Sequence, residues 1–306
     1  MVDVLIGLAP VMVAAMAVFR WYAVKQVVVC VVSCLAAEAI FAAMRRRRPS
    51  LADCSAAVTG VILAFSLPWS APWYVGMIGS FAAVGLGKAA FGGLGQNIFN
   101  PAMVGRAFVM ICFASAMGAS AYVRAGADLD VVTQATPLTA VRSARLGAGP
   151  DWSLVWPLFV GNVNGSVGET SALACLIGGL YLCIRRTAAW QIPVGMILAV
   201  AAVGGAGDLL HPHHPFSVVH HLFGGAVMLG AFFIATDPVS SPLTAKGRFI
   251  FGAGIGALVM LMRAYSGYPE GVMFSVLLMN ALTPLINRAT IPRPIGGPVP
   301  AKAPGT

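Results

Sequence analysis

Residues Thr59–Pro72, TGVILAFSLPWSAP, begin as an apolar run that favours a membrane helix and end in prolines and serines that break one. A similar pattern returns at Leu229–Pro242, LGAFFIATDPVSSP. When Pro68 is aligned with Pro238, four further positions match: Gly60 with Gly230, Ser66 with Thr236, Ser70 with Ser240 and Pro72 with Pro242. This correspondence predicts an internal repeat.

A second pair of segments supports the repeat. Asn100–Phe108, NPAMVGRAF, corresponds to Tyr268–Val276, YPEGVMFSV, at nearly the same distance from the first pair in each half. Matching spans are five apart, and because five is odd the two copies run through the membrane in opposite directions. The sequence therefore predicts two inverted five-helix repeats.

The composition is that of an integral membrane protein. Of the 306 residues, 58% are hydrophobic and 9% are charged, which leaves too little polar surface to cover a soluble globule. The apolar runs lack the strict alternation of barrel strands, so helices are expected. The predicted fold class is all-α and polytopic, with about ten transmembrane helices at 4–19, 24–44, 51–67, 73–91, 102–117, 168–184, 192–207, 218–235, 248–265 and 271–287.

The basic residues predict a topology, and no nucleic-acid partner is expected. The formal charge is +9, but the basic residues do not cluster on one amphipathic face with interleaved aromatic side chains. With a cytoplasmic N-terminus, the inside segments hold 13 of the 19 lysines and arginines, including the run Arg45–Arg48. Both termini are therefore expected in the cytoplasm, with a first repeat at 1–118, an extracytoplasmic loop at 119–150, a second repeat at 151–290 and a tail at 291–306.

Helix-breaking residues predict where a site would lie. The segments GGLGQNIFNPA and TDPVSSP interrupt the apolar pattern, one in each half. Inverted repeats commonly place a site or pathway at their interface, lined by broken helices. These patterns are compatible with a channel, a transporter or a membrane redox subunit.

The outward loop contains Asp130-Val-Val-Thr133-Gln-Ala135-Thr136, followed by Pro137. As a bare pattern it is typical of a turn. It also resembles the Asp-x-x-Ser/Thr-Gly-Ala-Thr motif on which a flavin transferase attaches FMN through a phosphoester to the last threonine. Thr136 supplies the required hydroxyl and Ala135 is small, whereas Gln134 departs from the usual glycine.

Four longer segments carry a resemblance to a known family: GKAAFGGLGQNIFNPAMVGRAF, GSVGETSALACLIGGLYL, GAFFIATDPVSSPLTAKGR and GYPEGVMFSVLLMNALTPLI. Together they resemble the RnfD subunits of Rnf ferredoxin:NAD+ oxidoreductase complexes and, more distantly, NqrB of the Na+-translocating NADH:quinone reductase. The resemblance covers about residues 51–293 and implies a subunit of an ion-pumping electron-transfer complex in a bacterial inner membrane.

The same resemblance implies the cofactor and the partners. Covalent FMN would be attached at Thr136, with Asp130, Thr133 and Ala135 as the rest of the motif, after maturation by a flavin transferase. The flavin would supply one-electron chemistry that no side chain provides. The implied partners are the other subunits of the complex and either Na+ or H+, between which the sequence does not choose.

Asn97 and Asn100, in NIFNPA, are candidates for a second site. Their amides could hydrogen-bond the ring edge of a second, non-covalent flavin such as riboflavin, or the backbone groups that the helix break leaves free.

Three acidic residues are candidates for an ion pathway, because a charge inside a membrane costs roughly 2.5 to 3.5 kcal/mol. Glu38 lies within the second expected span and has no basic residue within one helical turn. Glu169 opens the sixth span, where it could be an ordinary helix-start acid. Asp237 ends the eighth span, where it could cap the turn before Pro238.

No metal site is expected. The six cysteines form no Cys-x-x-Cys pair, and the histidines at 211–221 have no carboxylate or thiol to complete a ligand set, so an exposed loop is expected there. The alternative to a flavin-carrying redox subunit is a solute permease or channel of the same inverted-repeat architecture without a chromophore.

Overall fold

A computed structural model describes residues 1–46, 53–117, 152–161, 163, 165–210, 217–266 and 270–292. The elements before residue 118 are α1 (Val2–Phe19), α2 (Trp21–Met44), α3 (Ser55–Ser66), α4 (Trp73–Val84), the π-helix η2 (Gly85–Ala89), α5 (Pro101–Cys112) and α6 (Ala114–Met117). Those after residue 151 are the 3-10 helix η4 (Trp152–Leu154), α8 (Val155–Val160), α9 (Ala172–Ile184), α10 (Gln191–Leu210), α11 (Val218–Phe223), α12 (Val227–Leu229), the π-helix η5 (Gly230–Ile234), α13 (Ala245–Tyr265) and α14 (Val272–Thr290).

The described chain is all-helical, as predicted, and multi-pass by length and composition. Five helices are long and apolar enough to cross a membrane, namely α1, α2, α10, α13 and α14. The shorter apolar helices α3, α5 and α9 occupy expected spans that were predicted to be longer. The expected fourth span consists of α4 and η2, and the eighth consists of α11, α12 and η5. Hydropathy thus located the helical regions but overestimated the length of several, because apolar residues also fill the breaks.

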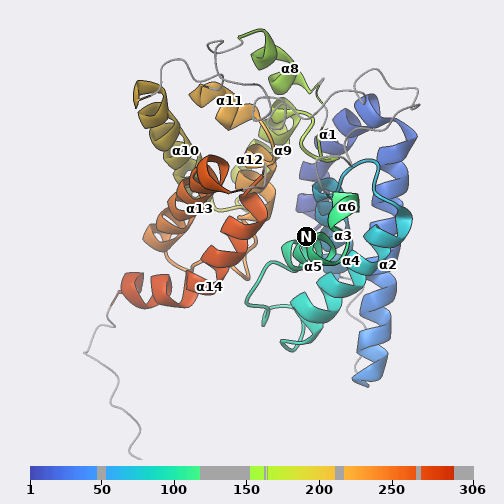
Figure 1. Ribbon diagram of the computed structural model, residues 1–306. Helices are drawn as coiled ribbons and strands as arrows, with labels where there is room; N and C mark the ends of the chain where they lie inside the picture. Colours follow the sequence, from blue (N-terminus) through green and yellow to red (C-terminus); the bar gives the residue numbers. More distant parts are fainter. Residues whose placement is uncertain are drawn as a thin grey trace, which may run out of the picture.

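Glycines allow several helices to pack closely. In Figure 1, α2 and α4 lie on one side of the molecule, α10 and α13 on the other, and the short helices α3, α5 and α12 between them. A Cβ atom on Gly178 of α9 would overlap the Gly7 carbonyl oxygen of α1, and one on Gly252 of α13 would overlap that of Ile192 on α10. Contact between backbones at small residues is a common basis of helix association in membranes.

Two helix breaks, one in each half, hydrogen-bond each other. Pro68 and Ser166 form an isolated antiparallel β-bridge. The Val167 N–H donates to the Leu67 carbonyl at 3.1 Å, and the Gly168 N–H donates to the Phe65 carbonyl at 2.8 Å. The segment at 165–171 therefore satisfies backbone acceptors that the end of α3 would otherwise leave unpaired in an apolar interior.

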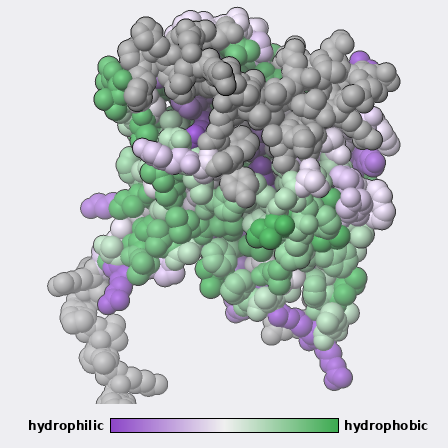
Figure 2. Space-filling view, viewed as in Figure 1, coloured by the Kyte–Doolittle hydropathy of each residue, from purple (hydrophilic) through white to green (hydrophobic). Residues whose placement is uncertain are grey.

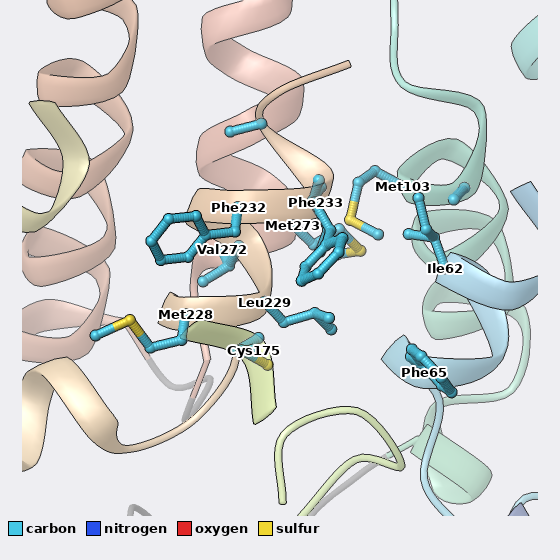
Figure 3. Packing of buried hydrophobic residues seen from close by; sticks show 14 of the residues in the cluster. Ile62, Phe65, Met103, Cys175, Met228, Leu229, Phe232, Phe233, Val272 and Met273 are labelled. Carbon is cyan, nitrogen blue, oxygen red and sulfur yellow. The ribbon is translucent and has the colours of Figure 1, made fainter. Parts of the chain in front are cut away.

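Hydrophobic side chains of the short helices fill the centre of the molecule. Figure 3 shows Ile62 of α3 and Met103 of α5 facing Phe233 of η5 and Met273 of α14. These side chains are buried, so the core joins elements from the two halves of the sequence.

The outer surface is largely apolar. Figure 2 shows hydrophobic residues over much of the face below the grey region, with hydrophilic side chains at its lower and lateral edges. Long helices expose large apolar side chains, among them Val32, Leu198 and Leu261. A surface of this kind suits contact with lipid or with other membrane helices.

Candidate functional site

The flavin-attachment motif lies outside the described residues. Asp130, Thr133, Ala135 and Thr136 all fall within 118–151, for which the structure gives no placement.

Asn100 caps helix α5. Its Oδ1 accepts hydrogen bonds from the Ala102 and Met103 N–H groups at 3.0 and 3.3 Å. Its Nδ2 donates to the Ile234 carbonyl at the end of η5, at 3.0 Å. Asn100 thus makes bonds to the freed backbone, and it connects the break before α5 to the π-helix of the other half.

Of the two polar side-chain atoms of Asn97, one has a hydrogen-bond partner among the described residues and the other has none. Its Nδ2 donates to the Phe99 carbonyl at 3.1 Å, while its buried Oδ1 finds no hydrogen-bond partner among the described residues. A cavity of about 70 Å³ is lined by both asparagines together with residues from the two halves, including Thr59, Lys88, Phe233 and Asp237. This volume holds a few waters at roughly 30 Å³ each, and it is too small for a flavin ring without local opening.

Asp237 lies at the edge of the same cavity and caps its own turn. Its Oδ2 accepts a hydrogen bond from Ser240 Oγ at 2.8 Å, and its Oδ1 accepts one from the Val239 N–H at 3.4 Å. These are the bonds expected of an aspartate that initiates a turn before a proline.

Glu38 has a buried cationic partner that the sequence did not reveal. Lys88 Nζ lies 2.7 Å from Glu38 Oε1 and also donates to Ser55 Oγ at 2.7 Å. The two charged side chains are only 6% and 7% exposed. Lys88 belongs to η2, which contacts α2, and a Cβ on Gly85 at the start of η2 would crowd the Phe41 ring of α2.

A larger cavity adjoins this ion pair. It has a volume of about 310 Å³ and is lined by Glu38, Phe41, Arg45, Asp53 and Lys88, together with the glycine-rich segment that follows η2. Lys88 lines both this cavity and the smaller one. The ion pair therefore lies between them.

Glu169 does not begin a helix, because α9 starts at Ala172 and Ser171 provides its N-cap. The Glu169 carboxyl instead lies within hydrogen-bonding reach of the Glu270 carboxyl. Glu270 Oε2 is 3.2 Å from Arg106 Nη2 on α5, and its Oε1 accepts a hydrogen bond from the Ala226 N–H. The guanidinium of Arg263, near the end of α13, lies close enough to act electrostatically on both carboxyls.

Sequence reasoning missed Lys88, Arg106, Arg263 and Glu270. Lys88, Arg106 and Arg263 make buried or partly buried contacts that join segments far apart in the sequence. His220, expected in an exposed loop, is buried against Ser217. The sequence feature that could have pointed to these buried charges was the presence of a charged residue within an otherwise apolar segment.

The helices and their charged contacts define the class of the protein: a multi-pass helical membrane protein in which one ion pair, Arg106–Glu270, joins the two halves and another, Glu38–Lys88, lies within the first half. Within this class, a protein-family model described as the NQR2, RnfD, RnfE family matches residues 1–296. The chain belongs to that family.

Curated relatives match nearly the whole chain. It is 44% identical over 298 residues to the D subunit of the Na+-translocating ferredoxin:NAD+ oxidoreductase complex of Acetobacterium woodii, covering 97% of this chain and 90% of that protein. It is 40% identical to the D subunit of the ion-translocating oxidoreductase complex of Halorhodospira halophila, covering 96% and 90%. It is 39% identical to the D subunit of the proton-translocating ferredoxin:NAD+ oxidoreductase complex of Clostridium ljungdahlii, also covering 96% and 90%.

Proposed function

We propose that the chain is the D subunit of an ion-translocating ferredoxin:NAD+ oxidoreductase complex in a bacterial inner membrane. The observation that carries this proposal is the match along nearly the whole chain to relatives with that function. The other subunits of the complex are its partners. The relatives are named for different ions, Na+ in one case and protons in another, so their names do not choose the ion.

The proposed cofactor is FMN, covalently attached at Thr136. Support comes from the hydroxyl and the small neighbouring residue in DVVTQAT and from membership of the family. The flavin supplies electron transfer in single steps. The chain supplies the attachment hydroxyl and a low-dielectric core around its buried ion pairs.

The attachment proposal is tested by in-gel fluorescence of the denatured subunit, because only a covalent flavin survives denaturation. Thr136→Ala removes the only oxygen on which the proposed ester can form, and the fluorescence should disappear. Thr133→Ala is the matched control and should retain it. Fluorescence that persists in Thr136→Ala would place the attachment elsewhere, and a wild-type subunit without fluorescence would favour the permease or channel alternative.

A second flavin, such as riboflavin, is proposed near Asn97, where the cavity of about 70 Å³ would have to open locally to admit the ring. The unpartnered Oδ1 of Asn97 could accept an N–H from the ring, whereas the Asn100 amide already bonds the backbone on both sides. Asn97→Ala should therefore lower the non-covalent flavin content, measured after acid extraction, without loss of the covalent flavin. An unchanged extract would remove Asn97 from the site.

The architecture proposed for the membrane is two inverted five-helix repeats with both termini in the cytoplasm. Support comes from the matched motifs of the two halves. Residues 119–150 would then lie on the extracytoplasmic side, where a flavin transferase would act.

Ion coupling is proposed to involve Glu38, Glu169 and Asp237. Glu38 is ion-paired with Lys88 between two cavities, so a cation moving there would compete with the lysine for the carboxylate. Glu38→Gln should keep the covalent flavin while electron transfer slows and loses its dependence on cation concentration. A Glu38→Gln complex with unchanged rate and cation dependence in proteoliposomes would reduce Glu38 to a structural partner of Lys88.

A further inference from the structure

The Glu169–Glu270 pair lies where three helix breaks meet. Glu169 belongs to the segment before α9, Glu270 directly precedes α14, and Ala226, which donates to Glu270, lies in the break before α12. Arg106 reaches the pair from α5. Groups from both halves of the sequence therefore surround two neighbouring carboxyls.

The two carboxyls have unequal sets of partners. Both oxygens of Glu270 are engaged, Oε2 by Arg106 at 3.2 Å and Oε1 by the Ala226 N–H. Oε2 of Glu169 accepts the Ser166 N–H at a long 3.4 Å, and the Ser166 side chain also hydrogen-bonds this carboxyl. Oε1 of Glu169 is buried and has no hydrogen-bond partner among the described residues.

The cations nearby are committed to other groups. Arg106 forms its ion pair with Glu270 rather than with Glu169. Arg263 donates to the His221 carbonyl at 2.6 Å and to the Gly224 carbonyl at 2.7 Å. Within the described part of the chain, the titratable and charged groups that act on Glu169 or are acted on by it are Glu270, Arg106, Arg263 and the Cys175 thiol.

Two ionised carboxylates in contact away from water repel each other strongly, and one proton shared between them removes that repulsion. The partners decide which carboxyl holds it. Glu270 has a guanidinium and a backbone N–H to stabilise its negative charge, whereas the hydrogen-bond donors that reach Glu169 among the described residues come from Ser166 and are uncharged. A protonated Glu169 carboxyl also has an O–H group, which can donate a hydrogen bond to Glu270.

We propose that Glu169 and Glu270 form a proton-binding site in which Glu169 carries the proton and donates it in a hydrogen bond to the Glu270 carboxylate. Loss of the proton leaves two carboxylates in contact and pushes the 165–171 segment away from the start of α14. In the ion pathway proposed above, the proton would be the ligand of Glu169, and in that respect the assignment rests on the proposed function. The protonation itself requires neither a flavin at Thr136 nor a particular translocated ion.

Infrared spectroscopy of the purified complex tests the site directly, because a protonated carboxyl has a carbonyl band that a carboxylate lacks and that shifts in D2O. The wild-type minus Glu169→Gln difference spectrum at neutral pH should contain this band. The Glu38→Gln difference spectrum is the matched control and should lack it, because Glu38 forms an ion pair with Lys88 rather than a contact with a second carboxyl. Absence of the band from the Glu169→Gln difference would overturn the proposal while leaving the flavin assignment intact.

Thermal unfolding provides a second readout. A glutamine mimics the protonated carboxyl, so Glu169→Gln should match the wild-type midpoint at neutral pH. As pH rises, the wild-type midpoint should fall with loss of the proton, and that of Glu169→Gln should fall less. Glu270→Gln should lower the midpoint already at neutral pH, because Arg106 loses its carboxylate. A Glu169→Gln complex that does not assemble, or one with the wild-type pH dependence, would contradict a neutral Glu169.

Discussion

At the scale of single residues, the Glu38–Lys88 ion pair shows how an intramembrane charge is held. Both side chains are buried, and Ser55 accepts a second hydrogen bond from the lysine. Such a pair is not by itself strong evidence of stabilisation, but removal of one partner leaves an uncompensated buried charge.

Lys88→Met should therefore destabilise the subunit by about 3 to 5 kcal/mol, the typical cost of breaking a buried pair. The measurement is thermal or denaturant unfolding of the purified complex. Adding Glu38→Gln to Lys88→Met should recover part of the loss, because the unpaired charge is then removed. Lys25→Met, at an exposed position of α2, is the control and should have little effect; equal losses in both lysine variants would show that the pair is not the cause.

Asn100 offers a second prediction at this scale. Asn100→Ala removes the cap of α5 and the donor to Ile234, which should cost about 1 kcal/mol for the cap alone and more for the unpaired carbonyl. Asn100→Ser retains a capping oxygen and should lose less. The order of unfolding midpoints, wild type above Ser above Ala, checks both functions of the side chain, and a Ser variant no better than Ala would show that the cap contributes little.

At the scale of elements, close helix packing depends on particular glycines. On α13, a Cβ at Gly252 would collide with the backbone of α10, whereas on α10 a Cβ at Gly207 meets no atom within 4 Å among the described residues. Both glycines lie within helices, so the difference between them reports packing and not helix propensity.

Gly252→Ala should therefore lower the thermal midpoint, because α13 must move away from α10. Gly207→Ala should be neutral or stabilise by about 0.4 to 1 kcal/mol through the unfolded chain. Membrane-inserted yield and unfolding of the two variants provide the comparison. A Gly252→Ala variant as stable as Gly207→Ala would mean that the two helices can separate at little cost.

The elements also show how far the sequence could predict this molecule. Long apolar runs such as those of α2 and α10 were located because hydropathy is a local property. The bond from Lys88 to Glu38 joins positions 50 apart, and that from Arg106 to Glu270 joins positions 164 apart, so only the packed fold brings these charges together. Asn100 was found as a candidate because a helix break is also visible locally, but its bond to Ile234 was not.

At the scale of the whole molecule, the topology remains a prediction that labelling can check. A cysteine introduced by Ala125→Cys should react with an impermeant thiol reagent in right-side-out vesicles. One introduced by Arg186→Cys, in the exposed turn after α9, should react only in inside-out vesicles. The exposed native Cys112 should first be replaced by serine. Reversed labelling of the two sites would invert the proposed orientation.

The hydrogen bonds between the two breaks also bear on biosynthesis. The Phe65 and Leu67 carbonyls receive their partners only when residues 167 and 168 have been made, so the first half emerges from the ribosome with acceptors that lipid cannot satisfy. An N-terminal fragment expressed alone should therefore be degraded by quality-control proteases. Co-expression of the C-terminal fragment should stabilise it. The order of synthesis makes the early half dependent on the late one, so a truncated message should yield no stable membrane fragment.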